Sequence, residues 1–354
     1  MMRIAKQTVC LLALSLAAAC GGQNNGGQAT GPTPTPGVTP TPPAPGQTGM
    51  AVSWSASGVQ PSTISLFVVD ATSTGWTCTT LPYLPTGAAV LNVQASMPVA
   101  GSATFNNVAP GGDYLVAAFG NMADGTRVSE ACQGPIAVLS GQLTPVTLGL
   151  TSFTPTITGS YLVTQHFNLG LPPDVQTALI TLELACGSLG DPQLCTVVDQ
   201  VTQIVTNLDV VAKWTFNQTA TGSWTGSVQW LSVQGYDVSA WNLVSGTFVA
   251  SGAGAGLSYK NYDLTIQFGN LMLFIVQDVL GYNLGALGGP GAALVQAFAS
   301  QYVGPLVFSG GGTVMDNAPQ DGVADQIDGN LTGVLTVSGW SHDFSMAYVG
   351  TRSP

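Results

Sequence analysis

Short apolar segments rich in β-branched residues recur at roughly ten-residue spacing between residues 50 and 152, and this spacing constrains the fold most. Residues 63–69, 113–119 and 146–150 are three of these segments, and glycine, proline and asparagine stand between them. Such residues favour tight turns, because they tolerate the backbone angles that turns require. The pattern therefore predicts an antiparallel β-sandwich over residues 50–152.

Residues 155–350 mix strand and helix patterns. Residues 157–167 alternate as a strand does, and two amphipathic helical patterns follow between residues 172 and 208. Residues 211–268 are typical of four or five strands, whereas residues 271–280 are apolar on every side, as in a buried helix. We predict an α+β domain in which a curved antiparallel sheet packs on apolar helices. The apolar helix either lines a lipid cavity or fills the sheet.

The composition excludes several classes of protein. Only 6% of the residues are charged and the formal net charge is −11, while 45% of the residues are hydrophobic, which excludes disorder for most of the chain. After residue 20 the basic side chains are Arg127, Lys213, Lys260 and Arg352. Nucleic acid and anionic lipid headgroups both require clustered basic residues, so neither is expected as a partner.

The amino terminus has the layout of an export signal. Arg3 and Lys6 precede an apolar run over residues 9–19, and small residues stand directly before Cys20. This layout resembles the bacterial lipoprotein signal, although the leucine of that motif stands one place early, at Leu16. The resemblance implies that residues 1–19 are a signal peptide and that Cys20 carries the acyl anchor, with palmitate among its chains. Cleavage without lipidation is the alternative.

Residues 20–49 form a tether rich in threonine, proline and glycine. Proline at this density favours an extended path of about 3.1 Å per residue, as a stalk requires. A proline-rich ligand for a groove-binding domain is the alternative. In lipoproteins the residue after the acylated cysteine guides sorting, and Gly21 is not the aspartate of inner-membrane retention. The resemblance therefore implies attachment to the outer membrane.

Four cysteines follow the anchor position: Cys78, Cys132, Cys186 and Cys195. An even number in an exported chain predicts two disulfides, and four cysteines permit three pairings. The pairing of Cys78 with Cys132 and of Cys186 with Cys195 is preferred, because each pair then lies within one predicted domain.

One motif in the first domain consists of Gly101, Phe105, Val108, Pro110, Tyr114 and Val116. Its spacing resembles the signature of prealbumin-like modules of the carboxypeptidase-regulatory and Cna-B types. The resemblance implies that Phe105 and Val108 enter the core, that a tight turn follows Pro110, and that Tyr114 begins the next strand. Such modules are mostly spacers and occasionally bind glycans or protein partners.

The densest acidic segment is residues 316–328, and it resembles calcium-binding loops of the EF-hand type. The candidate ligands, at loop positions 1, 5, 7, 9 and 12, are Asn317, Asp321, Val323, Asp325 and Asp328. Pro319 occupies another ligand position, and Asp328 is shorter than the usual glutamate. Calcium is the one cofactor considered, and a polar loop that joins two strands is the alternative.

The sequence contains no convincing catalytic constellation. Ser341, His342 and Asp343 are consecutive, and consecutive residues of a strand point to opposite faces, so they cannot form a triad. His166 and His342 are the only histidines. We therefore predict a non-catalytic lipoprotein of the cell envelope, a structural or binding module whose partner is an envelope protein or a glycan. An apolar-ligand carrier is the alternative, and a hydrolase is the weaker one.

Overall fold

The structure is a computed structural model that describes residues 46–353. Its gaps are residues 88–89, 107, 190–191, 262, 318 and most of 286–301. The signal peptide, Cys20 and nearly all of the tether lie outside the described residues. No helix in the described part of the chain combines the length and the hydropathy that a membrane span needs.

The first sheet has seven strands and curls into half a barrel. The strand bounds are β1 (Gly49–Ala56), β2 (Thr63–Asp70), β3 (Val90–Met97), β4 (Ala100–Phe105), β5 (Gly111–Asn121), β6 (Arg127–Val138) and β7 (Leu143–Ser152), and α1 (Ala71–Thr74) follows β2. The hydrogen-bonded order is β3-β2-β5-β6-β7-β1-β4. The predicted β-rich character is confirmed. One pairing differs from the antiparallel prediction, because β1 runs parallel to β7.

The larger of two clusters of buried residues lies on one face of this sheet. Phe105, Val108, Tyr114 and Val116 are all buried there, together with Trp54 of β1. Gly111 and Gly112 begin β5 at an irregularity in its pairing with β6, and their φ angles of 84° and 75° favour glycine. The Tyr114 hydroxyl then donates a hydrogen bond to the Ala109 carbonyl at 3.1 Å. Phe105 and Val108 therefore enter the core as predicted, whereas the next strand, β5, begins at Gly111 and not at Tyr114.

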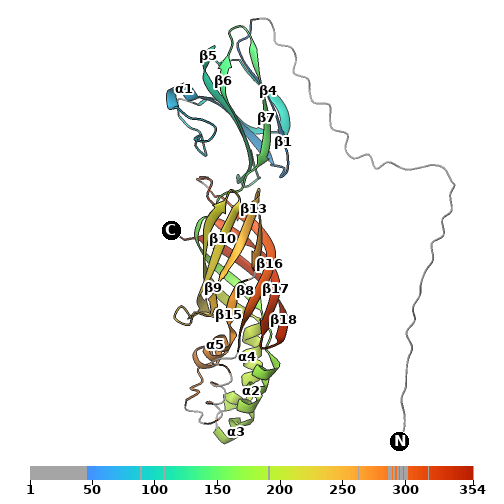
Figure 1. Cartoon of the computed structure of the whole chain (residues 1–354), viewed down its shortest axis with the longest axis vertical. Coiled ribbons are helices and arrows are strands. Elements are labelled where there is room, and N and C mark those ends of the chain that lie inside the picture. The colour runs from blue at the N-terminus through green and yellow to red at the C-terminus, as the bar shows by residue number, and fades with distance from the viewer. Residues whose placement is uncertain are drawn as a thin grey trace, which may run out of the picture. The chain divides into compact units, whose positions relative to one another are not determined.

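The second sheet closes on itself as an eight-stranded antiparallel barrel, because its last strand pairs with its first (Figure 1). In order around the barrel the strands are β8 (Gly159–Asn168), β9 (Leu208–Ala220), β10 (Ser223–Val233), β13 (Thr247–Ala253), β14 (Gly256–Asn261), β16 (Val303–Met315), β17 (Gln326–Val337) and β18 (Trp340–Arg352). Short strands β11 (Tyr236–Asp237), β12 (Val244–Ser245) and β15 (Thr265–Gln267) extend it.

Aromatic side chains of the strands fill the barrel interior. The Trp214 ring centroid lies 5.1 Å from that of Tyr348, 5.2 Å from that of Phe248 and 5.9 Å from that of Tyr259. A closed barrel of eight strands is just wide enough for side chains to fill its interior. The predicted curved antiparallel sheet is therefore a closed barrel filled by residues of its own strands, and the apolar helices belong to the same core.

The helices come from two insertions, and they gather at one end of the barrel (Figure 1). Between β8 and β9 lie α2 (Pro173–Leu184), α3 (Cys186–Leu189), η1 (Pro192–Thr196) and α4 (Val197–Thr206); between β15 and β16 lie α5 (Phe268–Phe274) and the π-helical η2 (Ile275–Val279). Each of α2 and α4 buries one apolar stripe, exemplified by Leu179 and Val201. Nearly all of α5 is buried in the same core, which confirms the predicted buried helix.

Glycines in the barrel strands stand directly opposite aromatic residues. Gly333 pairs with Phe344, Gly329 pairs with Tyr348, and both pairs join β17 to β18. A Cβ atom at Gly333 would lie 2.8 Å from two ring carbons of Phe344 and would also collide with the Val307 carbonyl. The ring thus covers the glycine and takes the space of the missing side chain.

Replacing Gly333 with alanine is expected to lower the free energy of unfolding by about 1–3 kcal/mol, because the new methyl group overpacks the interior. Gly256→Ala is the matched control, since its Cβ would meet the Ala253 carbonyl oxygen at an ordinary 3.4 Å. Urea unfolding followed by circular dichroism measures both variants. Equal stability of the two variants would show that the ring does not require the glycine.

Candidate functional site

The cysteines pair as preferred from the sequence. Cys78 bonds to Cys132, with Cα atoms 5.5 Å apart, and Cys186 bonds to Cys195, with Cα atoms 5.3 Å apart. The first disulfide ties the loop after α1 to β6, and the second closes the bend between α2 and α4. Both disulfide predictions are confirmed, and both bonds brace the fold.

Two of the candidate calcium ligands, Asp321 and Asp325, accept hydrogen bonds from the backbone of their own loop. An Asp325 carboxylate oxygen accepts the Asn317 backbone N–H at 2.8 Å, and Asp321 accepts the Val323 N–H at 3.0 Å. Asp328 lies in β17 and accepts a hydrogen bond from the Thr313 hydroxyl. No group of three histidine, cysteine, aspartate or glutamate side chains gathers in the described part of this loop or elsewhere in the described chain. The calcium site stays a prediction.

The central carboxylate of this loop is Asp316, which the sequence did not single out. It is buried, and it accepts the backbone N–H groups of Gly322 at 2.9 Å and of Asp321 at 3.3 Å. Burial raises the pKa of Asp316, while the nearby Tyr83 side chain and the backbone N–H groups of Gly322 and Asp321 act in the opposite direction. One feature of the sequence could have identified Asp316. It stands directly before Asn317, where a strand ends and a polar loop begins.

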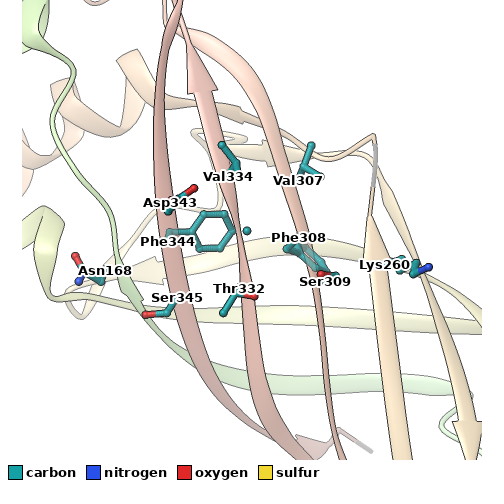
Figure 2. Close-up of a pocket in the computed structure, with 11 residues that line it drawn as sticks. Asn168, Lys260, Val307, Phe308, Ser309, Thr332, Val334, Asp343, Phe344 and Ser345 are labelled. Carbon is teal, nitrogen blue, oxygen red and sulfur yellow. The ribbon is translucent and has the colours of Figure 1, made fainter. Parts of the chain in front are cut away.

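The two histidines lie in different environments. His166 Nδ1 is 2.7 Å from an Asp209 carboxylate oxygen, and both side chains are exposed. His342 stacks on Trp340, with ring centroids 5.3 Å apart. Ser341 instead meets the Thr336 hydroxyl at 3.1 Å, and Asp343 points to the outside of the barrel (Figure 2). The structure therefore brings no Ser-His-Asp triad together at residues 341–343.

The outer wall of the barrel carries an open groove of about 740 Å³ over β16, β17 and β18 (Figure 2). Its lining is Asn168, Lys260, Val307, Phe308, Ser309, Thr332, Gly333, Val334, Asp343, Phe344 and Ser345. Outward-facing side chains of neighbouring strands form the rim. Along each strand, an outward-facing residue of the rim is followed by a residue that points into the barrel core.

The floor of this outer groove is the backbone at Gly333, and aromatic rings pack directly beneath it because Gly333 has no side chain on its inner face. Phe344 and Phe308 enter the barrel from the two neighbouring strands and are 4% and 5% exposed. Figure 2 shows the Phe344 ring at the centre of the group, with Val334, Thr332 and Asp343 around it. The rings thus lie directly beneath the peptide backbone at Gly333.

The rim supplies hydroxyl, amide and charged groups. Thr332, Ser309 and Ser345 present hydroxyls, which both donate and accept hydrogen bonds. Lys260 and Asp343 stand on opposite sides of the group in Figure 2. One charge of each sign balances the other, so the outer groove suits a polar ligand without net charge.

A second groove of about 710 Å³ lies on the same wall. Its lining includes Thr164 and His166 of β8, Asn330 of β17, and Gly329, beneath which lies Tyr348. Gly329 and Gly333 are four residues apart on one strand, which corresponds to about 13 Å. The same glycine-over-aromatic arrangement therefore occurs twice along the wall.

Comparisons with known proteins place this chain in no family. No family model and no curated protein matches it. A solved structure described as EF1p2_mFAP2b bound to DFHBI is similar to it at 11% sequence identity, over 56% of this chain and 94% of that chain. The TM-score of that comparison is 0.27, and a score this low carries no argument.

Proposed function

We propose that this chain is a non-catalytic binding module of the cell envelope, exported and held at the outer membrane by an acyl group on Cys20. Its ligand is a neutral, hydroxyl-rich polymer such as a glycan, bound along the outer wall of the barrel. The amino-terminal half of this proposal rests on the signal-like sequence of residues 1–20 and on the proline-rich tether. For residues 50–152 we propose a β-sandwich module of the prealbumin-like type. The burial of Phe105, Val108 and Tyr114 supports this assignment.

The outer groove over Gly333 carries the proposal. Sugars offer many hydroxyl groups, so they fit a rim of hydroxyl and amide groups on an open sheet surface. Thr332, Ser345 and Asn168 supply neutral hydrogen-bonding groups, and Phe344 lies beneath the backbone at the centre. The repeat of this arrangement about 13 Å further along β17 favours an extended ligand over a single small molecule.

The barrel interior supports this choice, because the aromatic core fills it. The interior void lined by Gln165, Trp214 and Trp230 measures about 10 Å³, which is roughly the room that one water molecule needs. An acyl chain would have to displace the rings that surround Trp214. Nothing in the packing therefore favours the apolar-ligand carrier over binding at the outer wall.

Calorimetric titration with neutral hexasaccharides (cellohexaose, maltohexaose, chitohexaose and xylohexaose) tests the proposal. We expect at least one of them to bind, and the variant Thr332→Val with Asp343→Asn to bind it roughly tenfold or more weakly. One neutral and one charge-assisted hydrogen bond would be removed, and each is worth about 0.5–3 kcal/mol.

Thr351→Val is the matched control, because Thr351 is an outward-facing threonine of β18 that lines neither groove. This variant should bind as the parent chain does. The proposal is wrong if every hexasaccharide fails to bind the folded protein, or if the control and the groove variant lose affinity equally.

A further inference from the structure

A separate pocket of about 460 Å³ lies on the first sheet, beside the disulfide between Cys78 and Cys132. Its lining includes Tyr83 from the disulfide loop, Arg127 and Glu130 from β6, and Phe153 just after β7. The volume lies in the range of pockets that hold small ligands, about 300–1,000 Å³. No residue of this pocket belongs to either groove of the barrel wall.

Arg127 is the buried cation of this pocket. Its residue surface is only 5% exposed, whereas Lys213, Lys260 and Arg352 are exposed. The guanidinium lies between two rings, 3.7 Å from the Tyr83 centroid and 3.5 Å from the Phe119 centroid. Stacking of this kind holds a guanidinium in one plane, with its N–H groups directed to the edges.

The hydrogen bonds of Arg127 are incomplete. One Nη group donates to the Tyr83 carbonyl, and the other lies 3.7 Å from a Glu130 carboxylate oxygen. The buried Nε–H has no hydrogen-bond partner. A buried donor without an acceptor costs free energy, and a buried cation costs more, so the guanidinium as a whole favours a nearby anion.

The surrounding charged groups offset only part of the free-energy cost of burying the Arg127 cation. Burial lowers the pKa of Arg127, although Tyr83, Glu130 and Asp316 act in the opposite direction. Burial likewise raises the pKa of Glu130, against the effect of Arg127. The Glu130 side chain is 45% exposed, so water screens its pairing with the guanidinium. The charged forms of Arg127 and Glu130 are thus both less stable here than in water. An anion that pairs closely with Arg127 would therefore be bound favourably.

We propose that this pocket binds the carboxylate of a small ligand, with Arg127 as the recognising cation and Phe153 and Leu81 packing against the carbon skeleton of the ligand. The carboxylate accepts from the Nη group of Arg127 that lies 3.7 Å from Glu130, in a charge-assisted hydrogen bond. Glu130 competes for the same cation at the pocket mouth. This site is independent of the glycan proposal.

Two sources supply such a carboxylate, namely the carboxy-terminal residue of a peptide and a uronic acid. N-acetylphenylalanine represents the first and glucuronate the second, and N-acetylphenylalanine amide lacks the charge. Calorimetric titration of the full chain should show that one of the two acids binds at least tenfold more tightly than the amide. Which acid binds identifies the source.

Glu130→Gln is the variant that tests the proposal most directly, because it removes the charge of a part-exposed side chain and nearly keeps its shape. We expect the acid to bind it about fivefold more tightly, since the competing carboxylate is gone. Arg127→Gln should abolish binding, but this substitution also removes a stacked core group, so its melting curve must be recorded alongside.

Three results would overturn this assignment. The first is equal binding of the acid and the amide, and the second is no binding of either acid at millimolar concentration. The third is weaker binding of the acid to Glu130→Gln, which would show that Glu130 does not compete with the ligand for Arg127. Thr332→Val leaves this binding unchanged if the two sites are independent, so failure of one proposal is distinguishable from failure of the other.

Discussion

Replacing Trp214 with alanine is expected to lower the free energy of unfolding by about 3–5 kcal/mol, the largest effect of any single substitution proposed for this chain. Trp214 is completely buried, and its ring contacts the rings of Phe248, Tyr259 and Tyr348. Alanine would leave a cavity at the centre of the barrel, and the closed sheet cannot collapse around it. Urea unfolding followed by circular dichroism gives the difference.

Trp214→Phe is the matched control. The indole N–H of Trp214 has no hydrogen-bond partner, so phenylalanine removes an unsatisfied donor and keeps most of the aromatic contact. We expect this variant to lose less than about 1.5 kcal/mol. If the alanine and phenylalanine variants were equally stable, the interior rings would not form the core that holds the barrel closed.

Replacing both Cys78 and Cys132 with serine is expected to cost about 4 kcal/mol in the chain-entropy model. The two residues are 54 positions apart, so the disulfide closes a long loop. The same change at Cys186 and Cys195, which are 9 positions apart, should cost about 3 kcal/mol. Thermal unfolding of the two double variants compares them, and a larger loss for the shorter loop would contradict the loop-length argument.

The sequence predicted those features that depend on neighbouring residues. Alternating patterns located strands such as residues 157–167, which became β8, and an all-apolar run located the buried α5. Cysteine pairing followed from the domain boundary alone, because one pair lies on each side of it. Local periodicity and turn residues carry this information, since each is set within a few positions.

Barrel closure could not be read from local pattern. It depends on β18 pairing with β8, for example Tyr348 with Gln165, and these residues are far apart in the chain. An open curved sheet and a closed barrel have the same alternation of inward and outward residues. From the sequence, the aromatic residues could be assigned to strands only. That their rings meet around Trp214 is visible only in the structure.

Candidate sites were predicted least well, because they depend on what lies opposite in space. The acidic loop drew attention to Asp325 and Asp328, yet the buried carboxylate is Asp316. Arg127 carried one signal, as a rare basic residue at the start of a strand in a charge-poor chain. Only the structure shows that Tyr83 and Phe119 enclose it. The outer groove likewise requires glycines and aromatics from three strands to meet.

Nuclear magnetic resonance shift mapping during titration with the hexasaccharide that binds tests the central claim most directly. We predict that the backbone amides of Thr332, Gly333 and Ser345 shift, together with those near Gly329 if the ligand spans both grooves. The indole N–H of Trp214 should stay unchanged. Shifts confined to Trp214 and its neighbours inside the barrel would contradict binding at the outer wall and favour an interior ligand instead.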